Sequence, residues 1–271
     1  MKLENIKNLL DLGGITLADG RRIAPGRILR SASLDEVSDL EAAALSDRFG
    51  PLTVIDLRTD TEVQEKPDVH IPGVQYVHIP IFKESVIGIT KETGADTGAY
   101  IKRTWNRKAI RAALPDMLDI YGSVMRDPSI VARISEVLHL IVKNALQGRA
   151  TLFHCSQGKD RTGAVSALLL SFCGLDRESV FDDYERGGLF WRGKALKDAV
   201  LLTLFKWDVK AARIAYKANL ARREFIRAAY DAIDEEYGSV ERLFRDVIGL
   251  SDEVRSRFLA AVTEPANFQS A

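Results

Sequence analysis

One of the two cysteines in this 271-residue chain lies at the start of a short turn, in the stretch FHCSQGKDRTG from 153 to 163. The apolar run ATLFH before it predicts a buried strand, and TGAVSALLLSFCG after it predicts a helix buried on all sides. A strand, a tight turn and a helix in this order point the N–H groups of the turn into one concavity at the helix N-terminus. The stretch therefore predicts an anion cradle with Cys155 on its rim.

The residue types in this cradle predict a nucleophilic thiol. Arg161 follows Cys155 by six positions, and its cation together with the helix dipole should lower the pKa of the thiol and favour the thiolate. A guanidinium can hold two phosphate oxygens while loop amides hold the third. We therefore expect phosphate-ester cleavage through a covalent phosphocysteine, with the substrate-binding residues in the loop itself: Ser156, Gln157, Gly158, Lys159 and Arg161.

Two carboxylates compete for the role of proton donor to the leaving oxygen. Asp160 lies within the loop, and its alternative role is an ion pair with Lys159. Asp56 ends the predicted strand LTVID, at the sheet edge where α/β sites form, and its alternative is an ion pair with Arg58.

Two neighbours of the cysteine are expected to support it. Thr162 could donate a hydrogen bond to the thiolate or cap the helix. His154 is expected to orient the loop through hydrogen bonds, the commoner role of a core histidine. Cys173 lies on the buried helix and is interpreted as a packing residue, with an approach to Cys155 under oxidation as the alternative.

Strands and helices alternate along the chain, which predicts a single α/β domain over residues 1–271 with a mostly parallel central sheet flanked by helices. The segment around ADGRR predicts a hairpin turn, followed by a strand at RILRS. Helices are expected at SDLEAAALSDRFG, with Leu40 and Leu45 on the apolar side, at SIVARISEVLHLIVKNALQG, and through the tail from about 220. Residues 83–128 are interpreted as a helical, lid-like insertion with a basic cluster from Lys102 to Arg111.

The loop sequence HCSQGKDRTG resembles the H-C-x-x-G-K-D-R-[TS]-G signature of the atypical bacterial and fungal protein tyrosine phosphatases, which include related bacterial lipid phosphatases. The segments NLLDLGG, GRILRSASL, VIDLRTDTE and AIDEEYGSVERLFRD also resemble segments of that family. The resemblance implies that Cys155 is the nucleophile, Arg161 the phosphate clamp and Asp160 the general acid. Lys159 would favour acidic or multiply phosphorylated substrates. Leu10 and Gln157 depart from the usual arginine and alanine of the family.

Composition limits the partners. Lysine plus arginine and aspartate plus glutamate both number 38, so no overall charge attracts nucleic acid. The sequence has neither a run long enough to span a membrane nor a signal-peptide core, so we expect a soluble, cytoplasmic protein, with leaderless export as an alternative. The two cysteines match no zinc spacing, and we expect neither metal nor cofactor.

The sequence leaves several functions open. A phosphatase for phosphotyrosine, with phosphoserine and phosphothreonine as further substrates, is preferred. The nearest alternative is a phosphoinositide phosphatase, which Lys159 beside Arg161 would suit. A phosphate-binding pseudo-enzyme and a sulfur-transfer protein are weaker alternatives, because the KDRTG continuation and the intact Cys155 and Asp160 favour phosphate turnover.

Overall fold

The computed structural model describes residues 3, 6–84, 86, 89–90, 108 and 116–265. At its centre lie five strands: β1 (Leu10–Asp11), β3 (Ile28–Ser31), β4 (Leu52–Asp56), β5 (Gln75–His78) and β6 (Ala150–His154). They form one sheet in the order β1-β3-β6-β4-β5. Every pairing is parallel except that of β1 with β3. The expected mostly parallel sheet is therefore confirmed, with β6 at its centre.

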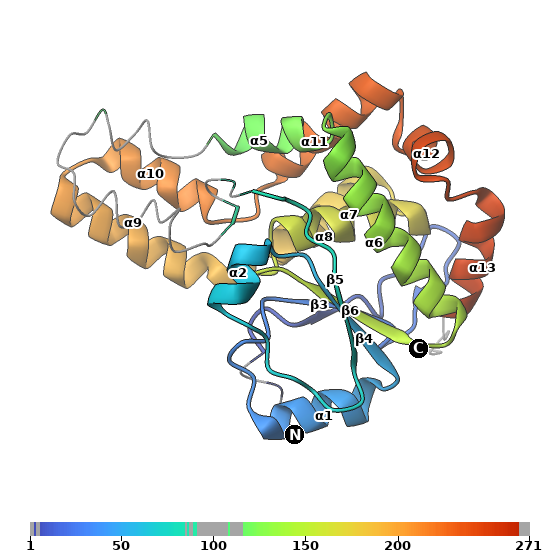
Figure 1. Ribbon diagram of the computed structural model, residues 1–271. Coiled ribbons are helices and arrows are strands. Elements are labelled where there is room, and N and C mark those ends of the chain that lie inside the picture. The colour runs from blue at the N-terminus through green and yellow to red at the C-terminus, as the bar shows by residue number, and fades with distance from the viewer. Residues whose placement is uncertain are drawn as a thin grey trace, which may run out of the picture.

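Helices cover both faces of the sheet (Figure 1). Alternate side chains of β6 point to opposite faces, so Leu152 joins the apolar cluster under α1 (Asp39–Phe49) and Phe153 joins the larger cluster on the other face. The helices on that larger side are α5 (Met117–Val124), α6 (Pro128–Leu146), α7 (Arg161–Cys173), α8 (Arg177–Arg186), α11 (Arg223–Tyr237), α12 (Val240–Arg242), the π-helical η3 (Leu243–Ile248) and α13 (Asp252–Val262).

Helix α7 is the central helix of the larger layer. All its residues except Ser171 are buried, which explains why its sequence is apolar on every side. Helix α6 begins where Asp127 accepts a hydrogen bond from the Ser129 N–H, with Pro128 in the first turn. Both helices were expected from the sequence, and both are confirmed.

Three local features go beyond or differ from what the sequence predicted. The turn at 18–22 exists, since Thr16 and Arg22 form a bridge, but β2 (Arg22–Ile23) pairs with β7 (Thr263–Glu264) near the C-terminus. Leu40 is 72% exposed, whereas Leu45 is fully buried. Strand β5 lies at the sheet edge and is only half-buried, because no strand covers its outer side among the described residues.

The predicted insertion at 83–128 lies largely outside the described residues, which leave out 91–107 and 109–115. Its described end is α5, which packs along α11. Whether the segment is a lid therefore stays a prediction. The short helix α2 (Asp60–Glu65) follows β4, and its N-terminus is fixed by a capping box between Thr59 and Glu62.

Two further helices form a hairpin that extends from the rest of the domain (Figure 1). They are α9 (Arg192–Lys206) and α10 (Val209–Ala218), preceded by the single turn η2 (Leu189–Trp191). The sequence had not resolved this region. Among the described residues, no helix is both long enough and apolar enough to cross a membrane.

Candidate active site

Strand β6 and helix α7 are joined by residues 155–160, called the cysteine loop from here on. It lies at the carboxyl end of the central parallel strand, with β3 and β4 on either side. Gly158 has φ +66°, and a Cβ there would lie 2.3 Å from the carbonyl oxygen of Ser31. Glycine is therefore required both by the backbone angle and by the close approach of β3.

The Cys155 thiol is buried in this loop. Burial alone would raise its pKa, but the charge of Arg161 and the neighbouring hydroxyl and N–H of Thr162 outweigh that effect and lower the pKa. A lower pKa increases the fraction of thiolate, the nucleophilic form of the group.

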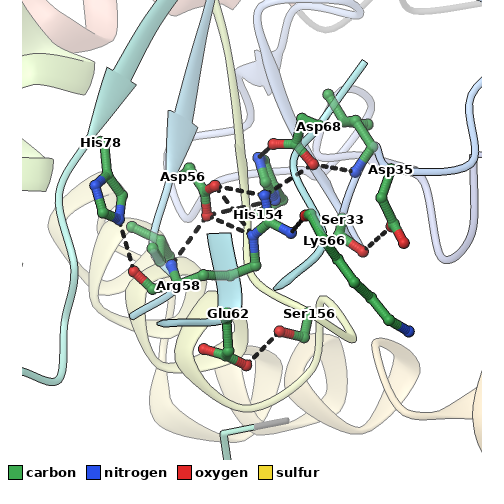
Figure 2. A network of polar contacts seen from close by, with 12 residues as sticks. Ser33, Asp35, Asp56, Arg58, Glu62, Lys66, Asp68, His78, His154 and Ser156 are labelled. Carbon is green, nitrogen blue, oxygen red and sulfur yellow. Dashed lines mark hydrogen bonds and ion pairs between the residues drawn. The ribbon is translucent and has the colours of Figure 1, made fainter. Parts of the chain in front are cut away.

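Arg161 and Glu62 form a two-pronged buried ion pair. One terminal nitrogen of Arg161 lies 2.5 Å from Glu62 Oε2, and the other lies 2.9 Å from Oε1. Ser156 also donates to Glu62 Oε1 at 2.5 Å (Figure 2). Burial would raise the pKa of Glu62, but these hydrogen bonds and the Arg161 charge lower it to about 2. Glu62 thus fixes the guanidinium and ties it to the start of the cysteine loop.

The carbonyl groups of the cysteine loop point toward donors outside it. The Asn8 amide lies 3.1 Å from the Gln157 carbonyl oxygen and 3.2 Å from that of Gly158. Trp191 Nε1 donates to the same Gln157 oxygen at 2.9 Å, and Arg30 donates to Gly158 at 3.1 Å. No backbone N–H from 156 to 160 donates a hydrogen bond to a described residue. These N–H groups are therefore available to an anion.

Asp160 accepts two kinds of contact inside the protein. Its carboxylate lies 2.8 Å from Lys159 Nζ and accepts a hydrogen bond of 2.9 Å from the Tyr121 hydroxyl. Tyr184 in turn donates to the Tyr121 oxygen at 2.6 Å. Lys159 also donates to the carbonyl of Ala218 at the end of α10. The expected ion pair of Asp160 with Lys159 is thus present. Because both residues belong to the cysteine loop, the pair keeps the carboxyl group there.

Next to the cysteine loop lies a cluster of four charged groups, the buried Asp56, Arg58 and His154 and the half-buried Asp68 (Figure 2). Arg58 lies 2.7 Å from an Asp56 oxygen and 2.9 Å from an Asp68 oxygen, while His154 Nε2 lies 3.0 Å from Asp68. Burial would lower the pKa of His154, but the Asp68 and Asp56 charges raise it to about 9. In this cluster the positive charges of Arg58 and His154 therefore balance the negative charges of Asp56 and Asp68.

This charge balance bears on two expectations for Asp56. Its expected ion pair with Arg58 is present, and although burial opposes it, the charges of His154 and Arg58 lower the pKa of Asp56 to about 2. Asp56, Asp68 and His154 are also close enough together to share a metal ion. Since Arg58 already occupies oxygens of both carboxylates, we interpret the cluster as a support for β6 and the loop.

The structure brings together the loop residues predicted from sequence: Cys155, Ser156, Gln157, Gly158, Lys159, Asp160, Arg161 and Thr162, with His154 beneath them. Cys173, by contrast, is the last residue of α7, and a helix rising about 1.5 Å per residue separates its ends by about 18 Å.

Sequence reasoning missed the residues that hold the loop from a distance: Asn8, Arg30, Glu62, Tyr121 and Trp191. The only signal for three of them, Asn8, Arg30 and Glu62, was their place in the segments NLLDLGG, GRILRSASL and VIDLRTDTE.

Comparison with known proteins identifies the class that this site belongs to. The family model for the tyrosine phosphatase family matches residues 1–264. The chain belongs to the tyrosine phosphatase family and is a phosphatase, a hydrolase that binds phosphorylated substrates.

Two individual relatives resemble nearly the whole chain. The triple specificity protein phosphatase PtpB of Mycobacterium tuberculosis is 28% identical over 250 residues, covering 87% of this chain and 90% of PtpB. A Cupriavidus necator protein, provisionally named a tyrosine-protein phosphatase, is 26% identical over 269 residues, covering 96% of this chain and 88% of that protein.

The Arg161–Glu62 pair makes a prediction about stability. Glu62→Gln keeps the shape of the side chain but leaves the buried Arg161 cation without its carboxylate, so the free energy of unfolding should fall by about 3 kcal/mol. Urea unfolding measures this. The control is Glu36→Gln, which breaks an exposed pair with Lys7 and should cost less than about 1 kcal/mol. Equal, small losses in both variants would show that the buried pair contributes little.

The His154 cluster predicts a loss of stability at alkaline pH. Because His154 holds its proton to about pH 9 when folded but only to about 6.5 when unfolded, its stabilising contribution is complete below about pH 6.5. It is lost as the pH rises to about 9, by up to about 3 kcal/mol. Urea unfolding across this range should show the decline in wild type.

The same titration in variants tests the assignment to this residue. His154→Gln should be less stable at pH 6 and should show a flatter dependence. His139→Gln, at an exposed histidine of α6, should follow wild type. If His154→Gln follows the wild-type curve, the alkaline loss arises elsewhere.

Proposed function

We propose that this phosphatase hydrolyses phosphate monoesters through a phosphocysteine formed on Cys155. The observation that carries the proposal is the set of N–H groups in the cysteine loop that donate to no described residue, beside a thiol of lowered pKa. In addition, Arg161 Nε is buried and has no partner among the described residues, so one guanidinium edge remains for phosphate while Glu62 holds the other nitrogens.

In the first step, the Cys155 sulfur attacks phosphorus, and the bond from phosphorus to the ester oxygen breaks as the sulfur–phosphorus bond forms. Charge that develops on the phosphoryl oxygens is stabilised by the loop N–H groups and by Arg161. Asp160 gives its proton to the leaving oxygen.

In the second step, water attacks phosphorus and gives a proton to the Asp160 carboxylate, while the sulfur leaves as the thiolate. Thr162 supports this departure, since its side chain and N–H stabilise the thiolate. The Tyr184–Tyr121 pair supports the position of Asp160, because Tyr121 donates to its carboxylate. Asp56, held by Arg58, supports the loop rather than donating the proton.

For the substrate, we propose phosphotyrosine first, with phosphoserine and phosphothreonine as further substrates. The membership in the tyrosine phosphatase family supports this order. Phosphoinositides are the second candidate class, favoured by the basic α9–α10 hairpin, whose last helix accepts a hydrogen bond from Lys159. Turnover of a phosphotyrosine peptide and of a short-chain phosphoinositide by the same preparation separates the two.

The covalent route predicts the effect of replacing the nucleophile. Cys155→Ser should lower the turnover of para-nitrophenyl phosphate at least about 1000-fold, an increase of about 4 kcal/mol in the barrier. Binding of inorganic phosphate, followed by calorimetry, should persist because the loop and Arg161 remain. Cys173→Ser at the far end of α7 is the control and should keep turnover. Cys155→Ser activity above a few per cent of wild type would contradict the covalent route.

The general acid predicts a dependence on the leaving group. An alkoxide needs a proton in the transition state, whereas para-nitrophenolate leaves readily. Asp160→Asn should therefore slow an alkyl phosphate about 100-fold or more and para-nitrophenyl phosphate less than about tenfold. Steady-state kcat for both esters measures the difference.

Asp56→Asn is the comparison, and it should slow both esters equally. If Asp160→Asn slowed both esters alike and the leaving-group dependence appeared at Asp56→Asn, the proton donor would be Asp56.

A further inference from the structure

The α9–α10 hairpin exposes an unusual density of large apolar side chains. On α9, Leu196, Val200, Leu201, Leu204 and Phe205 are exposed, and Trp207 and Val209 follow at the tip. Leu204 is 64% exposed, Phe205 63% and Trp207 77%. We call the first six of these residues, from Leu196 to Trp207, the apolar face of α9. It is turned away from α10, because the buried Ala195 and Lys206 lie on the other side of the helix.

The charged residues of the same hairpin are mostly basic. Residues 192–218 contain seven lysines and arginines but only two aspartates, in a chain whose net charge is zero. Lys194 and Lys197 lie among the exposed apolar positions of α9, and Lys210 and Arg213 are exposed on α10. Lysines between exposed leucines can rest their stems on an apolar layer while their charges reach anionic groups. This combination is typical of helices that lie on anionic membranes.

The hairpin is attached to the catalytic machinery at both ends. Just before α9, Trp191 donates to the Gln157 carbonyl oxygen at 2.9 Å. At the end of α10, the Ala218 carbonyl accepts from Lys159 at 3.2 Å. A surface that binds the hairpin is therefore held close to the cysteine loop.

We propose that the apolar face of α9 docks the protein on the surface of an anionic lipid bilayer. The apolar side chains enter the boundary between headgroups and acyl chains, and the flanking lysines and arginines contact the anionic headgroups. The cysteine loop is then presented to phosphate groups at the membrane surface. Docking does not depend on the proposed phosphocysteine chemistry, so the two can fail separately.

The test measures co-sedimentation of the full chain with vesicles of phosphatidylcholine, with and without phosphatidylglycerol. Wild type should partition onto the anionic vesicles at least about tenfold more strongly, and raising the salt from about 0.1 to about 0.5 M should weaken binding. The variant Leu204→Ser/Phe205→Ser/Trp207→Ser should lose about tenfold or more of this partition. Lys194→Glu/Lys197→Glu should lose the preference for anionic vesicles.

The controls separate docking from folding and from catalysis. Leu40→Ser removes a side chain that is 72% exposed on α1, outside the hairpin, and should bind vesicles like wild type. Cys155→Ser should also bind like wild type. The serine and glutamate variants should turn over para-nitrophenyl phosphate at the wild-type rate, because their side chains are exposed and outside the active site.

Four results would overturn the proposal. The first is equal partition of wild type on both kinds of vesicle, and the second is undiminished binding of the triple serine variant. The third is loss of aryl phosphate turnover in that variant. The fourth is absence of vesicle binding together with a dimer that the triple variant abolishes. The last result would identify the apolar face of α9 as an interface between two copies of the chain.

Discussion

The active site depends on keeping a buried cation oriented beside a buried sulfur. Arg161 lies in the interior of the protein, where an unpaired guanidinium would be strongly destabilising. Glu62 supplies the compensating charge and, through two separate oxygens, also fixes the plane of the guanidinium. The position of α2 follows from this requirement, because Glu62 belongs to its capping box and enters the site with the first turn.

A second constraint concerns the direction of the loop peptides. A loop that presents its N–H groups to an anion must turn its carbonyl oxygens outward, and buried carbonyls need donors. Asn8, Arg30 and Trp191 supply those donors from the N-terminal segment, from β3 and from the turn before α9. Segments that are distant in sequence are thus needed to shape one short loop. This explains why the family resemblance extends across the chain rather than stopping at the loop.

How much could be predicted from sequence follows from this arrangement. The path from Cys155 to Arg161 is local, so its strand, turn and helix could be predicted, and the apolar runs around it predicted the parallel sheet. Glu62 could not be assigned, because its contact with Arg161 exists only once β4 lies beside β6. The donors to the loop carbonyls are equally non-local. The burial of Leu40 was predicted wrongly, because the spacing of apolar residues shows that a helix has an apolar side but not which residues at the edge of that side are exposed.

The structure of the α9–α10 region could not be predicted from sequence, for a different physical reason. Apolar residues occur there on the exposed face of α9, and Lys206 and Asp208 are buried. The usual relation between polarity and exposure is thus reversed along this segment, so a periodic pattern gives no indication of a packed face.

The length of α7 has a consequence for redox chemistry. A thiolate is readily oxidised to a sulfenic acid, which is rescued most simply by a neighbouring thiol. The chain's only other cysteine, Cys173, lies at the opposite end of this helix and is buried there, with a pKa raised by burial to about 12. It can neither reach Cys155 nor readily form a nucleophilic thiolate. Reduction of an oxidised Cys155 by a thiol would therefore need a thiol from outside the chain.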